Sequence, residues 1–404
     1  IINNEKWNFS SIKNFLFCLF SFSEYNTIDS ILNKMSPSKK SHDYIQDLIR
    51  KNNFALKNFN DTILFNPISL SINSNSDEYF PAMSTNSDVL IFTYRDRNSI
   101  LKDEDFFISR KKDGEWGQPK RLGNNINSDY REGSLSISLG GDKLFFASCN
   151  RPDSYGGCDI YVSSLLSDTL WSESYNMGSV INTKFWESQP SISTDGKMLF
   201  FASDRVGGYG GTDIWVSRFF DGMWRDPINL GPLVNSESDE YTPFIHYDNE
   251  TFYFSSTGKM GFGGFDLFIA NIDSECVVSN VRNLGHPINT NNDESGLIVS
   301  SDGKTAYYNS FINNQLDIFS FMLPKELESQ RIALVNGIVI DSINRIGLES
   351  VDLLVTSLDK SFEYEYITSK SGYFSFSVPL LSAFNITITS NLHDFFSRDY
   401  FLVD

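Results

Sequence analysis

The sequence predicts a mainly β chain, in which a five-bladed β-propeller lies between a short helical segment and a small β-sandwich. Three observations predict this fold. One motif recurs five times at intervals of 53 to 55 residues. Each copy has room for four short strands and shows no helical pattern. Aromatic residues, which favour strands, make up 15% of the chain. A chain of 404 residues is also long enough for two or three domains.

The first sixty residues differ from the rest because they lack the alternating pattern of strands. Segments 10–22, 27–34 and 42–58 place apolar residues near helical spacing. We therefore expect a helical domain over 1–60. The chain opens with Ile1 rather than Met, so we expect a processed chain or a piece of a longer one.

Two acidic markers define the repeats. A glutamate opens each copy, at Glu78, Glu132, Glu187, Glu240 and Glu294. An aspartate precedes the third strand of each copy, at Asp105, Asp159, Asp213, Asp266 and Asp317. Because both markers keep one period through five copies, the propeller is expected over residues 61–328.

The third copy illustrates the strands expected in each blade, at 190–193, 198–202, 214–217 and 224–230. The fifth copy lacks the fourth of these strands. Residues 64–70 resemble 224–230, so we predict that 62–70 supply the outer strand of the last blade and close the ring.

The sequence after Glu328 predicts a separate domain over 332–404. Short apolar and aromatic runs are separated by turn residues there, which is typical of a small antiparallel sandwich. The five expected strands lie at 335–341, 351–355, 364–368, 372–378 and 384–389.

The motifs of these three parts resemble known families. Segments 187–203 and 208–214 are similar to WD-like repeats of the Tol-propeller type, and 337–341 with 372–376 resemble the carboxypeptidase regulatory-like, transthyretin-type domain. Segment 48–55 resembles the last helix of a tetratricopeptide (TPR) unit. That order of domains resembles the PorE-type envelope proteins of the Bacteroidetes type IX secretion system, which end in an OmpA-like peptidoglycan-binding domain. The present sequence contains no OmpA-like segment.

The resemblance implies a non-enzymatic scaffold of the periplasm, associated with the outer membrane and with type IX secretion or gliding machinery. Its implied partners are other envelope or secretion-system proteins. Peptidoglycan is implied only through an OmpA-like domain outside this chain. A glycan-binding or glycan-cleaving propeller is the alternative.

The net charge argues against two classes of partner, and the hydropathy argues against a membrane-spanning helix. The net charge is −18 and no long basic run is present, so we expect no binding to nucleic acid or anionic lipid. No run approaches the roughly 18 to 20 apolar residues that a membrane-spanning helix needs, so we expect no transmembrane segment.

Two cysteines flank a glycine-rich turn between two strand-like runs. Cys149 and Cys158 are nine residues apart, and a disulfide between them would indicate an oxidising compartment. The spacing alone leaves two free thiols as an alternative.

The five glutamates form the candidate site, because blade symmetry predicts that they share one level at the mouth of the channel. We expect them to accept hydrogen bonds from backbone N–H groups of a neighbouring blade. The alternative is an acidic ring that holds a divalent cation such as calcium or docks a basic partner. The five aspartates are expected to cap turns.

The sequence favours neither catalysis nor a cofactor. The four histidines (His42, His246, His286 and His393) lie far apart and outside the repeat markers. No nucleophile elbow or His-Glu-x-x-His motif is present. The glycines at 207–211 join two strands, which predicts a tight bend rather than a phosphate-binding loop.

Overall fold

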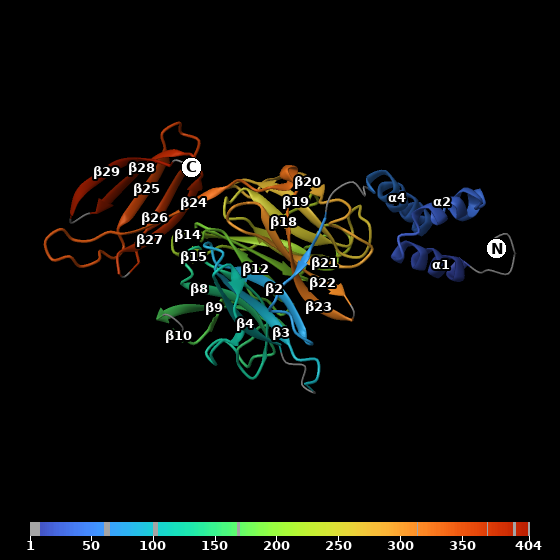
Figure 1. Cartoon of the computed structure of the whole chain (residues 1–404), viewed down its shortest axis with the longest axis horizontal. Helices are drawn as coiled ribbons and strands as arrows, with labels where there is room; N and C mark the ends of the chain where they lie inside the picture. Colours follow the sequence, from blue (N-terminus) through green and yellow to red (C-terminus); the bar gives the residue numbers. More distant parts are fainter. Residues whose placement is uncertain are drawn as a thin grey trace.

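A computed structural model describes residues 9–59, 65–99, 104–167, 170–312, 314–369, 371–390 and 393–402, and the chain in it is mainly β (Figure 1). Curled, propeller-like sheets occupy the middle of the molecule. Helices lie at one end and two further sheets at the other. Residues 1–8, 60–64 and 403–404, which belong to the domains expected from the sequence, lie outside the described residues.

The helices form by packing apolar faces on one another. They are α1 (Phe9–Ser21), α2 (Tyr25–Asn33), α3 (Pro37–Lys40) and α4 (Asp43–Asn58). In α1 the buried residues Ile12, Leu16 and Phe20 are four apart, as one face of a helix requires. Three of the helices start and end within two residues of the expected positions, while the short α3 was not expected. None of the described helices is long and apolar enough to cross a membrane.

Five antiparallel sheets follow one another between the helices and the C-terminal sheets. The first contains β2 (Asp77–Met83), β3 (Val89–Arg95), β4 (Glu104–Lys112), β5 (Glu115–Trp116) and β6 (Lys120–Arg121). The second contains β7 (Arg131–Ile137), β8 (Lys143–Cys149), β9 (Cys158–Ser167), β10 (Leu170–Trp171) and β11 (Tyr175–Asn176). The third contains β12 (Glu187–Ile192), β13 (Met198–Ser203), β14 (Asp213–Phe220), β15 (Met223–Trp224) and β16 (Ile228–Asn229).

The last two sheets have four strands each. The fourth contains β17 (Glu240–Ile245), β18 (Thr251–Ser256), β19 (Asp266–Ile272) and β20 (Val278–Asn283). The fifth contains β21 (Glu294–Val299), β22 (Thr305–Ile312), β23 (Gln315–Met322) and β1 (Ile68–Ser69).

Strand β1 joins the beginning of this region to its end. Ile68 lies opposite Ser320 and Ser69 opposite Phe319 in an antiparallel pair. The N–H of Leu70 continues the ladder by donating to the carbonyl of Ile318, at 3.1 Å. The edge of the last sheet is therefore covered by residues that come about 250 positions earlier in the chain.

The outer strand of the third sheet differs from the expectation. The sequence predicts one strand over 224–230, whereas β15 and β16 pair separately with β14. Pro227 lies between them, and proline has no N–H to donate to a ladder, so pairing is interrupted there.

The first strands of the five sheets line the axis, and each carries a bulge. The backbone at every bulge is left-handed, with φ between 48° and 64°, at Phe80, Ser134, Gln189, Thr242 and Gly296. A side chain from the preceding sheet of the ring holds several bulges in place. The Gln189 amide oxygen accepts the N–H of Thr242 at 2.7 Å, and the Thr242 hydroxyl accepts the N–H of Gly296 at 3.2 Å. These bonds join neighbouring sheets and offset the cost of the left-handed backbone.

Two C-terminal sheets share one apolar core. The first pairs β24 (Ile332–Ile338) with β27 (Tyr373–Pro379), and the second has the order β26 (Glu363–Ile367), β25 (Asp352–Ser357), β28 (Ala383–Ser390) and β29 (His393–Phe401). Strand β29 was not expected from the sequence. The buried residues between the sheets include Leu353, Val355, Phe376 and Phe384.

Direct contacts fasten this C-terminal region to the fourth sheet. The hydroxyl of Ser377 donates to the carbonyl of Tyr247 at 2.9 Å. The backbone N–H of Gln330, in the connection between the two regions, donates to Asp248 at 3.1 Å. The two regions therefore meet at the turn that joins β17 to β18.

Candidate functional site

The five repeated glutamates are buried at the start of the inner strands, with exposed fractions of 0 to 2%. Each carboxylate accepts the backbone N–H and the hydroxyl of a serine or threonine four residues earlier. The N–H bonds measure 2.7 to 3.1 Å, and the donors are Ser74, Ser128, Thr183, Ser236 and Thr290. Each glutamate thus fixes the connection that leads into its own inner strand.

This geometry contradicts an exposed acidic ring at the channel mouth. The carboxylates of Glu78, Glu132, Glu187, Glu240 and Glu294 point into their own connections, where internal donors occupy them. Within the described ranges, no group of three or more His, Cys, Asp or Glu side chains has the arrangement of a metal site. Hydrogen bonding to backbone N–H groups was expected, but the donors lie four residues away in the chain rather than across the next sheet.

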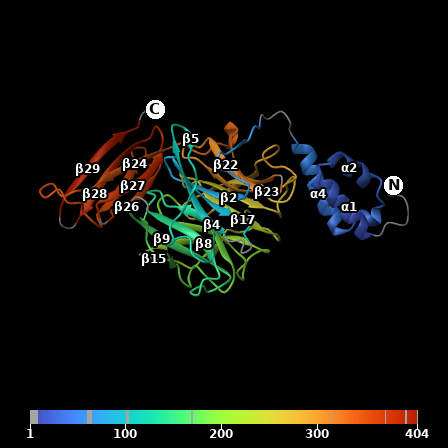
Figure 2. The ribbon, with the colours of Figure 1, turned by 60° about the horizontal axis from the view of Figure 1, so that its bottom comes forward.

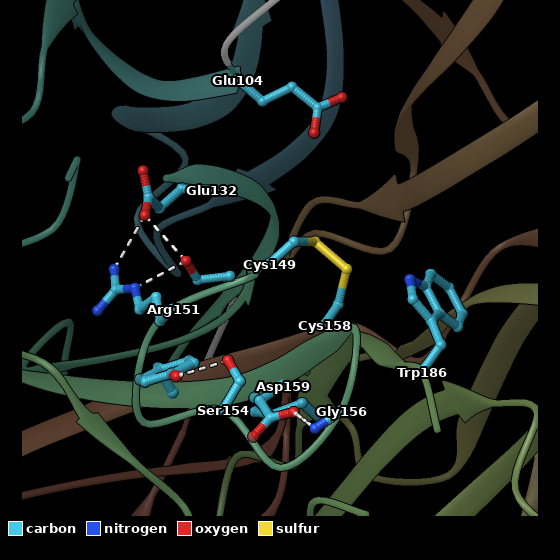
Figure 3. The surroundings of a disulfide bond; sticks show 12 residues. Glu104, Glu132, Cys149, Arg151, Ser154, Gly156, Cys158, Asp159 and Trp186 are labelled. Carbon is cyan, nitrogen blue, oxygen red and sulfur yellow. Dashed lines mark hydrogen bonds and ion pairs between the residues drawn. A yellow bond between two sulfur atoms is a disulfide. The ribbon is translucent and has the colours of Figure 1, made fainter. Parts of the chain in front are cut away.

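The glutamates differ in the positive charge beside them. Arg151 lies 2.9 Å from Glu132 (Figure 3). Arg205 lies 3.2 Å from Glu187, and both pairs are almost completely buried. Burial nevertheless raises the pKa of Glu132, while hydrogen bonds from Ser128 and Arg151 lower it.

Glu294 has no such partner among the ion pairs of the described chain. Burial is the main reason that its pKa rises to about 8, and Asp266 and Asp293 add to the increase. Burial also raises the pKa of Asp266 to about 7. Two carboxyl groups with pKa values near neutrality therefore lie close together in the fourth and fifth sheets.

Three of the repeated aspartates cap loops, as their position suggests. Asp159 accepts the N–H groups of Tyr155 and Gly156, and Asn176 donates to it from the outer strand at 2.7 Å. Asp213 and Asp266 receive equivalent bonds in the third and fourth sheets. Asp105 instead pairs with Arg121 at 2.8 Å, and Asp317 accepts the amide of Gln315.

A repeated asparagine, which the sequence analysis missed as a functional position, clamps every sheet. Asn182 donates to the carbonyl of Ile160 at 2.9 Å and accepts its N–H at 2.8 Å. In each sheet the side-chain amide of one asparagine bonds both the N–H and the C=O of a single residue in the third strand. These asparagines are Asn73, Asn127, Asn182, Asn235 and Asn289. The Ile-Asn or Val-Asn element of the repeat was the signal that could have revealed this clamp.

Cys149 and Cys158 form a disulfide. The two residues lie directly opposite each other where β8 ends and β9 begins, and Trp186 bridges to Cys158 on the other side (Figure 3). The bond therefore closes the turn that also holds Arg151 and the loop capped by Asp159.

The axis of the ring is nearly filled. A cavity of about 50 Å³ remains, and it is lined by the inner strands at residues that include Met83, Leu135, Phe244 and Ile298. None of the described residues that line it carries a charge. The axis is therefore lined by packed, uncharged side chains, both apolar and polar.

A much larger hollow lies at the periphery. It has a volume of about 1220 Å³ and is bounded by the third and fourth sheets on one side and by residues 361–365 on the other. Unlike the axis, it is lined by many charged side chains.

No family model and no curated protein matches the sequence. Solved structures with distant similarity include TolB from Acinetobacter baumannii, at 14% identity over 63% of this chain with a TM-score of 0.37. This chain matches 56% of that protein's length. A putative TolB from Agrobacterium tumefaciens is 11% identical over 76% of this chain and 91% of its own, with a TM-score of 0.39. A thermostable family-43 glycoside hydrolase is 11% identical over 66% and 92%, with a TM-score of 0.43. At these values the similarities assign no activity to the chain.

Proposed function

We propose that the chain is a five-bladed β-propeller with a TPR-like helical segment and a transthyretin-like β-sandwich, and that it acts as a non-enzymatic scaffold in the periplasm. Its partners are other proteins of an outer-membrane-associated assembly, of the type IX secretion or gliding kind. A tether to peptidoglycan would require an OmpA-like domain outside this chain.

The observation that carries this proposal is that the repeated glutamates are buried and form hydrogen bonds within the protein. The glutamates are buried and accept three or more internal hydrogen bonds in several sheets, as Glu132 does from Ser128 and Ser148. Groups engaged in this way stabilise the ring and are not presented to a substrate. Recognition is then left to the outer surfaces and to the hollow between the ring and the C-terminal sheets.

Two further features support the proposal. Glycoside cleavage uses two carboxyl groups on either side of the bond, whereas the axial cavity is lined by uncharged residues such as Ser134, Gln189 and Thr242. The disulfide between Cys149 and Cys158 is the type of bond that persists in an oxidising compartment such as the periplasm.

Cross-linking in the intact cell envelope, followed by purification of the full chain and mass spectrometry, tests the scaffold. We expect stoichiometric cross-links to other envelope proteins. A parallel assay measures the release of reducing sugar from arabino-oligosaccharides, and we expect none. Turnover of such a substrate would replace the scaffold with the glycan-cleaving alternative, and recovery of the uncross-linked chain alone would also contradict the proposal.

A further inference from the structure

The peripheral hollow is a groove that runs along the edge of a strand. Ser361 and Phe362, which precede β26, and the first three residues of β26, Glu363 to Glu365, line it, and successive side chains of a strand point to opposite faces of the sheet. Three successive strand residues that line one wall therefore reach it at the edge of the strand. In both views of the molecule β26 lies at the side of the C-terminal sheets that faces the propeller-like region (Figures 1 and 2).

That edge has room for another strand. In the sheet order β26-β25-β28-β29, β26 is terminal and pairs with β25 alone. A terminal strand carries backbone N–H and C=O groups that a neighbouring extended chain can bind. The opposite wall of the groove comes from β14, β16, β19 and β20 and their turns, so a bound segment would lie between two walls.

The lining of the groove is strongly acidic. Its seven carboxylates outnumber three basic residues: Asp195, Asp226, Asp248, Glu250, Asp273, Glu363 and Glu365 against Lys197, Arg218 and Arg225. Two of those bases are already paired, Arg218 with Glu275 at 2.8 Å and Arg225 with Asp221 at 3.7 Å. One of the carboxylates, Asp248, is buried and lies 3.1 Å from His246. The ion pairs of the described chain include neither Glu363 nor Glu365, so the free charge of the groove is negative.

Exposed apolar side chains lie among these charges. Phe219 and Phe220 at the end of β14, Ile228 in β16 and Val277 before β20 all line the groove, with exposed fractions of 38 to 63%. Side chains of a strand alternate between two faces, so a partner with alternating residues can place apolar groups on one wall and basic groups on the carboxylates.

We propose that this groove binds an extended segment of a partner protein, rich in lysine or arginine, as an additional strand on β26. The inference rests on the scaffold function and names the chemistry of one of its partners. The edge supplies the backbone bonds, the aromatic residues supply apolar contact, and the unpaired carboxylates select a basic sequence.

Fluorescence anisotropy of labelled octapeptides with the full chain tests this inference. The probe is a peptide of alternating lysine and valine, and its matched control alternates glutamate and valine. We expect the lysine peptide to bind at least tenfold more tightly, with an affinity that falls as salt rises. Equal binding of the two peptides, or affinity that is independent of salt, would overturn the inference.

A third peptide separates strand addition from charge alone. The lysine–valine peptide with every second backbone nitrogen methylated keeps its charge and loses half of its N–H donors. We expect at least tenfold weaker binding for it. Unchanged affinity would overturn the assignment of an added strand.

Two double variants locate the site. Glu363→Lys with Glu365→Lys reverses the charge of two exposed residues of β26, and we expect at least tenfold weaker binding of the lysine peptide. Glu115→Lys with Glu349→Lys changes the net charge equally at exposed positions outside the groove, and we expect unchanged binding. Equal affinity for the two variants would reject the groove. If the two variants bind the lysine peptide equally while the chain still cross-links to envelope proteins, the scaffold stands and only the assigned groove fails.

Discussion

The second and fifth sheets each bury a glutamate, but they compensate its charge in different ways. Both begin with a buried glutamate that accepts an N–H and a hydroxyl from the preceding connection. In the second sheet Arg151 neutralises Glu132, whereas in the fifth sheet burial raises the pKa of Glu294 to about 8. The two sheets thus share the same hydrogen-bond acceptor at this position but place it in different charge environments.

The two sheets also differ at their hairpins and clamps. Cys149 and Cys158 face each other across the hairpin of the second sheet, while the corresponding pair in the fifth sheet is Phe311 and Leu316. The asparagine that clamps the second sheet follows it in the chain, but the one that clamps the fifth sheet, Asn73, follows β1 and precedes all the other strands of the ring. One sheet is therefore closed locally and the other by distant residues.

The largest expected effect comes from removing the guanidinium group of Arg151, which lies beside Glu132. Arg151→Met leaves Glu132 buried without its ion pair, which we expect to lower the free energy of unfolding by about 4 kcal/mol at pH 7. Urea denaturation measures the change. Arg225→Met, in an exposed pair with Asp221, is the control and should cost less than about 0.5 kcal/mol. Similar losses in the two variants would show that Glu132 does not need its partner.

The clamps come next. Asn182→Ala leaves the buried N–H and C=O of Ile160 without partners, and we expect a loss of about 3 kcal/mol. Asn73→Ala removes the same two bonds from Ile318 in the fifth sheet, but Asn73 is only half-buried and water can replace part of the contact. We expect about 1.5 kcal/mol there. A larger loss for Asn73→Ala would mean that closing the ring matters more than burial.

The disulfide gives the second sheet a cross-link that the fifth lacks. Its cysteines are nine residues apart, so Cys149→Ser with Cys158→Ser should lower the free energy of unfolding by about 2 kcal/mol through the freedom that the unfolded chain regains. A thiol reductant should produce the same loss in the unaltered protein and none in the variant. If reductant destabilises the variant as well, the effect does not come from this bond.

The effect that depends most on pH concerns Glu294, which has no ion pair within the described residues. The pKa of Glu294 rises from an ordinary 4.5 to about 8, and that of Asp266 from 3.8 to about 7. The folded chain thus holds protons that the unfolded chain releases. The stability from these two groups is complete below about pH 4 and is lost as the pH rises to about 8.

Glu294→Gln keeps an acceptor for Thr290 and removes the charge. We expect the variant to be about 4 kcal/mol more stable than the unaltered chain at pH 8.5 and within about 1 kcal/mol of it at pH 5. Denaturation at both pH values provides the measurement, and Glu132→Gln is the comparison. That substitution separates Arg151 from its carboxylate and should destabilise at both pH values. If the stability of the two variants changed with pH in the same way, Glu132 and Glu294 would not differ in their charge state.

Much of the β structure could be predicted because strand patterns are local. The repeat spacing locates the strands between Glu78 and Phe321, and the likeness of 64–70 to 224–230 points to the strand that pairs with β23. The interrupted outer strand and the short α3 were missed, since each depends on a single proline within a short segment. Strand β29 was missed as well.

The sequence by itself determined the period, the alternation and the chemical type of each repeated residue, because these follow from spacing along the chain. Only the tertiary structure decided that Glu132 is buried beside Arg151 and that Glu294 is buried without a cation. It also decided that the edge of β26 faces an acidic groove. Burial and charge pairing depend on what the rest of the molecule places around a side chain, and that information is spread over segments far apart in the chain.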